Sequence, residues 1–112
     1  MNDELPDPSA FCVVTTTVAT EADAGTLARE IVAAGLGACA QVHPVQSHFF
    51  WKGDACAETE YRVDIKTRRA LYPRLEAFIR AHHRYDTPEI LAVPVLAGSA
   101  DYLRWLADGS MG

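Results

Sequence analysis

The chain has 112 residues, of which 49% are hydrophobic and 22% are charged, and its formal net charge is -5. This size and composition are typical of one globular domain with its own core, so we expect residues 1–112 to form a single domain. The acidic balance and the absence of a basic block argue against nucleic-acid binding, and no apolar stretch is long enough to span a membrane.

The first residues, "MNDELPDPSA", carry acids and prolines and lack the basic and apolar regions of a signal peptide. We therefore expect a loose tail over residues 1–8 and a cytoplasmic protein. The cysteines Cys12, Cys39 and Cys56 form no C-x-x-C pair. They fit free thiols in a reducing compartment better than a disulfide scaffold or a zinc ribbon.

The segment "AFCVVTTTV", residues 10–18, is rich in β-branched residues and predicts a strand buried on both faces. Helical spacing follows over residues 20–36, with Thr20 as the expected N-cap and Gly35 as the expected stop. The expected apolar stripe of this helix consists of Leu27, Ile31 and Ala34.

Extended segments are expected over residues 38–45 and 47–53, and residues 59–68 alternate between apolar and charged side chains. That alternation predicts a strand with one polar face. Glu58 and Glu60 are expected to be solvated charges near the end of a hairpin. The run "HFFW" places at least one aromatic ring on each face of its strand, which a single sandwich cannot bury, and this indicates a partner subunit.

A second helix is predicted over residues 70–83, where Pro73 is tolerated in the first turn and Pro88 prevents further extension. Its apolar stripe comprises Leu71, Leu75, Phe78, Ile79 and His82. Residues 89–96 predict a fourth strand, which Pro94 places at an edge or a bulge. A final helix over residues 99–108 begins at Ser99, and residues 108–112 are expected to be a loose tail.

This order, βαββαβ plus a helix, predicts an α/β (α+β) fold of the ferredoxin-like type. The four-stranded antiparallel sheet would carry both long helices on one face. Its other face would need a cover, and oligomerisation is the simplest way to supply one.

The segment "AHHRYDTPEI" holds the candidate site, because His82, His83 and Glu89 lie close together in sequence. Imidazole and carboxylate groups suit borderline divalent ions such as copper and zinc, with copper favoured by intrinsic affinity. Neighbouring helical residues diverge by about 100°, so both histidines can reach one ion only if the last turn opens. Two interpretations stay open, a structural turn between helix and edge strand and a metal site.

These residues resemble the CutA family of divalent-cation tolerance proteins over about residues 11–105. The resemblance rests on "LGACAQV", "FFWKG", "ETEY", "IKT", "HHRYDTPEI", "VPV" and "DYLRWL", which occur in this order. It implies a ferredoxin-like subunit, a homotrimer similar to the trimers of PII signalling proteins, and a role in metal tolerance without an established enzyme activity. It also places metal contacts at His82, His83 and Glu89. Thr16 stands where some relatives have a cysteine, and Arg84 where many have a proline.

We therefore expect a homotrimeric, non-enzymatic protein that binds Cu(II), and more weakly Zn(II), at no better than micromolar strength, and that is similar to PII proteins in binding small ligands between subunits. One alternative is a structural or scaffolding trimer, in which Trp51 and Trp105 are packing residues and the histidines are incidental. A hydrolase of the acylphosphatase type is disfavoured, because such an enzyme uses an asparagine and the single asparagine here is Asn2.

Overall fold

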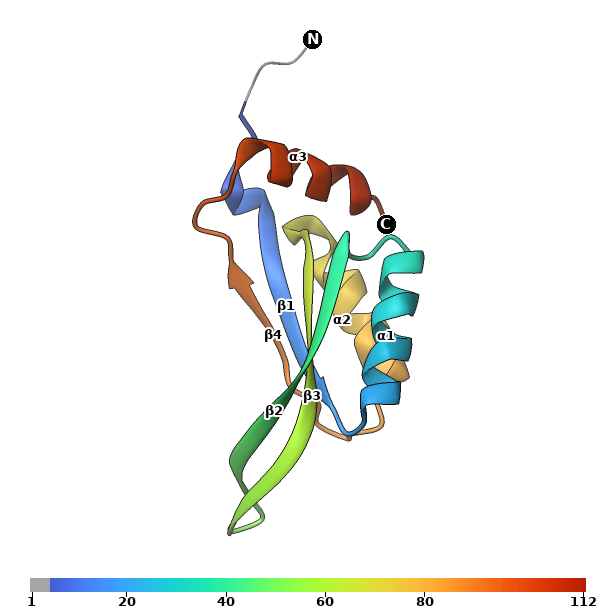
Figure 1. Ribbon diagram of the computed structural model, residues 1–112, viewed down its shortest axis with the longest axis vertical. Helices are drawn as coiled ribbons and strands as arrows, with labels where there is room; N and C mark the ends of the chain where they lie inside the picture. Colours follow the sequence, from blue (N-terminus) through green and yellow to red (C-terminus); the bar gives the residue numbers. More distant parts are fainter. Residues whose placement is uncertain (1–4) are drawn as a thin grey trace.

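A computed structural model describes residues 5–112 of the chain. Four strands form one antiparallel sheet with the order β2-β3-β1-β4, and the predicted ferredoxin-like topology is confirmed (Figure 1). The strands are β1 (Phe11–Val18), β2 (Cys39–Trp51), β3 (Asp54–Arg68) and β4 (Ile90–Pro94), and the helices are α1 (Glu21–Ala33), α2 (Tyr72–His82) and α3 (Ala100–Gly109). Among residues 5–112, none of the helices combines the length and apolar character that crossing a membrane requires.

Local signals in the sequence set the bounds of α1. The Thr20 hydroxyl accepts a hydrogen bond from the backbone N–H of Asp23 at 3.1 Å, which caps the first turn as predicted. Gly35 follows the helix with a φ of 72°, a conformation that glycine adopts without strain. The predicted stripe is wrong at Ala34, which is exposed because the helix ends one residue earlier.

The hairpin of β2 and β3 is longer than the sequence indicated. We predicted two extended segments before residue 54, but β2 runs without a break through Pro44, because β2 is an edge strand and a missing backbone donor there costs no sheet bond. Lys52 and Gly53 form the turn with φ values of 51° and 85°, which matches a two-residue turn with both central φ positive. The hairpin twists and extends well beyond the two long helices (Figure 1).

The core lies between one face of the sheet and helices α1 and α2, which cover the same side (Figure 1). Fully buried side chains from both layers meet there, namely Val14, Val63 and Ile65 of the sheet with Ile31, Leu75 and Ile79 of the helices. A smaller cluster joins Leu103 and Leu106 of α3 to Phe11. Helix α3 therefore covers one end of the opposite sheet face, and no helix formed by residues 5–112 covers the rest of that face.

The expected tail at residues 108–112 is packed against the domain. Ser110 is fully buried, and its hydroxyl donates to the carbonyl of Leu106 at 2.7 Å. The backbone N–H of Gly112 donates to the carbonyl of Gly35 at 2.9 Å. These bonds tie the segment to α3 and to the end of α1. Of the tail expected at residues 1–8, residues 1–4 lie outside the described residues, and Pro8–Ala10 forms a short 3-10 turn.

Candidate functional site

The candidate ligands lie where α2 ends and the chain turns back toward β4. His82 is the last residue of α2, and His83 has the extended dihedral angles φ -92° and ψ 143°. The last turn is therefore open between the two histidines. Both side chains could reach one ion only with the turn open in this way. Their rings nevertheless find different partners.

His82 directs an unprotonated nitrogen away from its own helix. Its Nδ1 lies 2.8 Å from the carbonyl oxygen of Phe78, and a carbonyl can only accept, so Nδ1 carries the proton. The ring also stacks on the ring of Phe78, with centroids 4.1 Å apart. In the neutral imidazole the Nε2 lone pair is then free, and Nε2 lies 3.8 Å from Oε2 of Glu30 on α1.

His83 uses both ring nitrogens within the protein. Its Nε2 donates to the carbonyl of Thr17 at 2.7 Å, and its Nδ1 accepts from the backbone N–H of Tyr85 at 3.1 Å. The ring thus joins the turn after α2 to the end of β1. A metal ion could bind His83 only by replacing one of these two hydrogen bonds.

Tyr85 fixes the same turn to β3. Its hydroxyl donates to Oε2 of Glu60 at 3.1 Å, and Glu60 is only 8% exposed. The prediction of two solvated glutamates is therefore wrong for Glu60, while Glu58 is exposed as expected. Burial, and then the hydrogen bond to Glu60, raise the pKa of Tyr85 to about 12.

We expect the phenol of Tyr85 to titrate near pH 12, well above the ordinary value of about 10. Because the folded pKa is the higher one, this group stabilises the fold fully below pH 10, and the contribution is lost as the pH rises toward 12. The measurement is ultraviolet absorbance of phenolate during alkaline titration. The difference between the wild type and Tyr85→Phe isolates the group, and a difference curve centred at the ordinary value would contradict the assignment.

A pocket of about 310 Å³ lies between α1 and the turn that follows α2. Its polar lining consists of Asp23, Thr26, Glu30, His82, His83, Arg84 and Tyr85. The guanidinium of Arg84 lies 3.4 Å from the carboxylate of Asp23, so Arg84 links the turn to α1. Glu89 is exposed and does not line this pocket. Within residues 5–112, no three His, Cys, Asp or Glu side chains are grouped so that they could hold one metal ion.

Thr16 lies in the core and is fully buried. Its hydroxyl has no hydrogen-bond partner among the described residues, and it does not line the pocket at His82. Thr16 and His82 are therefore separate features of this structure.

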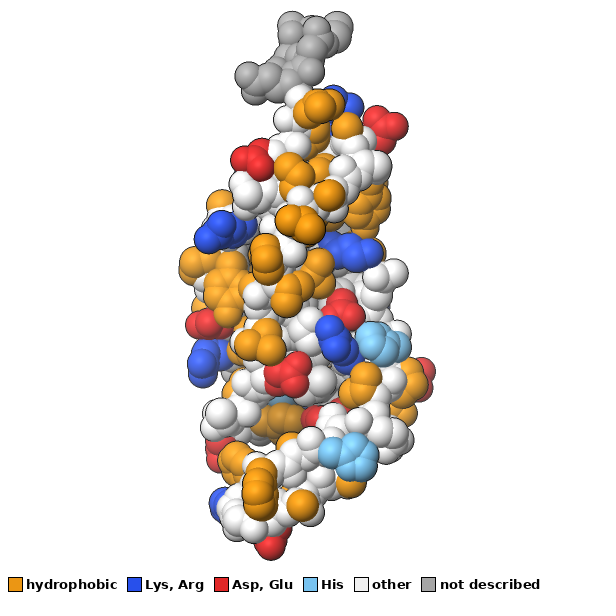
Figure 2. Space-filling model, turned by 90° about the vertical axis from the view of Figure 1, so that its left-hand side faces the viewer, with side chains coloured by type: hydrophobic (Ala, Val, Ile, Leu, Met, Phe, Trp, Pro, Cys, Tyr) orange, Lys and Arg blue, Asp and Glu red, His pale blue; other side chains and the backbone are white. Residues whose placement is uncertain are grey.

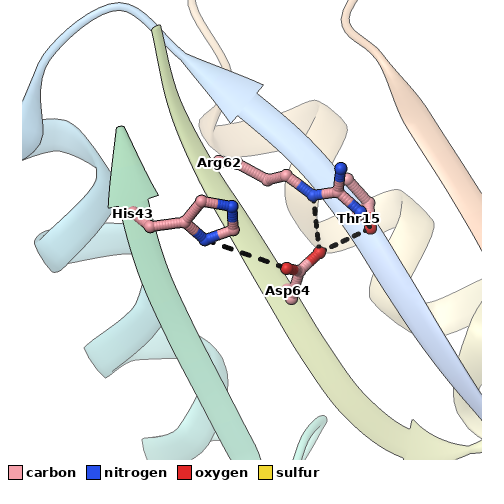
Figure 3. A network of polar contacts seen from close by, with 4 residues as sticks. All are labelled: Thr15, His43, Arg62 and Asp64. Carbon is pink, nitrogen blue, oxygen red and sulfur yellow. Dashed lines mark hydrogen bonds and ion pairs between the residues drawn. The ribbon is translucent and has the colours of Figure 1, made fainter. Parts of the chain in front are cut away.

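The sheet face away from α1 and α2 carries a polar network that crosses three strands (Figure 3). Asp64 accepts from the hydroxyl of Thr15 at 2.7 Å and from Nε of Arg62 at 2.9 Å, and Nδ1 of His43 lies 4.0 Å away. Burial alone would raise the pKa of Asp64, but these two hydrogen bonds and the charge of Arg62 hold it below its usual value. The network thus stabilises the fold at neutral pH, and its contribution is lost as the pH falls through the lowered pKa.

Apolar side chains lie beside this network. Leu91 and Val93 of β4 pair with Thr15 and Val13 of β1, so they share the open face, and they are 60% and 52% exposed. Hydrophobic side chains gather in the upper part of this side of the molecule (Figure 2). More apolar surface lies on the hairpin, where Phe50 is 78% exposed, and on α3, where Trp105 is 52% exposed.

Comparison with protein-family models matches residues 12–109 to the family described as CutA1 divalent ion tolerance protein. The chain is 38% identical over 107 residues to the divalent-cation tolerance protein CutA of Escherichia coli K12, covering 95% of this chain and 96% of that protein. It is similar in structure to CutA from Synechococcus elongatus, with a TM-score of 0.89, 34% identity and 96% of each chain covered. The structure described as the periplasmic divalent cation tolerance protein CutA from Archaeoglobus fulgidus gives a TM-score of 0.87 and 28% identity, over 89% of this chain and 98% of that one.

Proposed function

The chain belongs to the CutA1 family of divalent ion tolerance proteins, and from this premise we propose that it is a homotrimeric, non-enzymatic protein that binds divalent metal ions. Membership of this family supports a role in tolerance to divalent cations. The observation that carries the metal-binding part is the free Nε2 of His82 beside a carboxylate at the edge of a pocket. An imidazole nitrogen and a carboxylate oxygen are ligands for Cu(II) and Zn(II).

The proposed trimer rests on apolar surface that one chain leaves open. Leu91 and Val93 lie on the sheet face that neither long helix covers, and the tip of the hairpin exposes Phe50 and Trp51. Groups of exposed apolar side chains of this kind mark contact with another chain. Three copies of the subunit would cover these surfaces with one another.

We propose His82 as the anchor of the metal site, with Cu(II) preferred over Zn(II). The ligand set predicted from the sequence, His82, His83 and Glu89, requires the turn over residues 83–89 to rearrange. His83 would have to release Thr17 or Tyr85, and Glu89 would have to enter the pocket. A site with few protein ligands and open positions is expected to bind weakly, at no better than about micromolar strength.

Isothermal titration of the metal-stripped protein with Cu(II) and Zn(II) tests the proposal. We expect binding to the wild type and loss of specific binding in His82→Ala, because this variant lacks the proposed imidazole ligand. His48→Ala is the matched control, because His48 is an exposed histidine on the distant hairpin. A wild type that binds no divalent ion would contradict the proposal and favour the scaffolding alternative, in which Trp51 and Trp105 serve only to pack subunits together.

We further propose that the protein acts in the cytoplasm, where its three cysteines remain free thiols. The relative from Archaeoglobus fulgidus is described as periplasmic, so the compartment needs a direct test. Immunoblotting of fractionated cells decides between the two locations.

A further inference from the structure

We propose that Glu30 of α1, and not His83 or Glu89, completes the divalent-metal site of His82, so that the bound ion bridges α1 and α2. This inference rests on the proposed metal binding and names its second ligand. Neither the sequence pattern nor the family resemblance indicated Glu30, because it lies on a different helix, far from the paired histidines in sequence.

The first support is the direction of the His82 lone pair. The hydrogen bond from Nδ1 to Phe78 and the stacking on the Phe78 ring fix both the tautomer and the ring orientation. Metal-binding histidines commonly donate their other nitrogen to a backbone carbonyl in this way, which raises the basicity of the ligating nitrogen. His82 is therefore already oriented as a ligand, and its Nε2 faces Glu30.

The second support is distance. Two ligands on one tetrahedral ion, each about 2.0 to 2.2 Å from the metal, lie about 3.4 Å apart. Nε2 of His82 and Oε2 of Glu30 are 3.8 Å apart, and their side chains are 43% and 48% exposed. Half-exposed side chains can close a few tenths of an ångström at little cost. Both side chains line the pocket, so water could fill the remaining coordination positions of an ion held there.

The third support is the availability of each carboxylate. Among residues 5–112, His82 is the only cationic or imidazole partner within 4 Å of Glu30. Asp23 also lines the pocket, but it is paired with Arg84 at 3.4 Å. Glu89 lies outside the pocket, and both nitrogens of His83 are engaged. Glu30 is thus the carboxylate that can join His82 without any rearrangement of the turn.

Titration of the metal-stripped full-length protein with Zn(II) alone tests this assignment. We expect Glu30→Gln to weaken Zn(II) binding at least about tenfold. Glu89→Gln and the exposed control Glu58→Gln should remain within about twofold of the wild type. Glutamine keeps the size and helix propensity of glutamate, so the variants separate loss of the ligand charge from loss of the fold.

Nitrogen chemical shifts of the histidine rings give a second measurement on the same samples. On addition of Zn(II), the Nε2 signal of His82 should move, while His83 should keep its protonated Nε2. If the affinity for Zn(II) fell only in Glu89→Gln, or fell equally in Glu30→Gln and Glu89→Gln, Glu30 would not be the second ligand. The proposal that the protein binds metal ions would still stand. A wild type that binds no Zn(II) would overturn both the inference and this part of the proposed function.

Discussion

Replacing Leu91 and Val93 together by aspartate converts the proposed trimer into single chains. Both side chains lie on the sheet face opposite α1 and α2, and they are 60% and 52% exposed in one chain. In the trimer they would be covered by another subunit. Aspartate carboxylates buried there would lose their hydration without gaining a positively charged partner, which costs several kcal/mol per buried charge.

Light scattering of the purified proteins measures this effect directly. Val32→Asp is the matched control, because Val32 is 43% exposed on α1, in the other layer of the sandwich. We expect this control to keep the mass of the wild type. A double variant that still has the mass of three chains would show that this face is not the interface, and a wild type with the mass of one chain would contradict the trimer.

A second large effect is expected for His83→Ala, which should destabilise the fold while His82→Ala does not. Removal of the His83 ring leaves the carbonyl of Thr17 and the N–H of Tyr85 without their partners. An unsatisfied, partly buried polar group costs about 1 to 3 kcal/mol. His82 is more exposed and bonds only to a carbonyl of its own helix among the described residues, so its loss should cost less than about 0.5 kcal/mol.

Chemical denaturation at one fixed protein concentration measures both variants, because the stability of an oligomer depends on concentration. The metal titrations should give the reverse order, with binding retained in His83→Ala and lost in His82→Ala. Equal stabilities of the two variants would contradict the structural role of His83. If a folded His83→Ala protein no longer bound metal, His83 would be a ligand, as first predicted from the sequence.

Features of the fold that depend on neighbours in sequence could be predicted. Thr20 and Ser99 cap their helices as expected, since a capping side chain bonds to a backbone N–H only three residues away. Pro94 lies in an edge strand, as its missing N–H required. The sequence did not predict the continuous β2, because only the sheet order shows that Pro44 lies in an edge strand.

The candidate site could be predicted only in part, because some of its contacts join residues that are far apart in the sequence. The paired histidines stand out in the sequence, but the helix was predicted to continue through His83, whereas α2 ends at His82. Glu30 was missed because its contact with His82 depends on how α1 packs beside α2. Glu60 was wrongly predicted to be solvated because its partner, Tyr85, lies in the turn after α2. The alternation of residues along β3 gives no information about that contact.

Native mass spectrometry of the metal-stripped protein after addition of Cu(II) tests directly whether the protein is a metal-binding trimer. One spectrum reports both the number of chains and the number of ions in each species. We expect a species with three times the mass of one chain that carries up to one ion per chain. In His82→Ala we expect the trimer to remain and the ions to be lost. Single chains without bound metal in the wild-type spectrum would contradict the proposed metal-binding trimer.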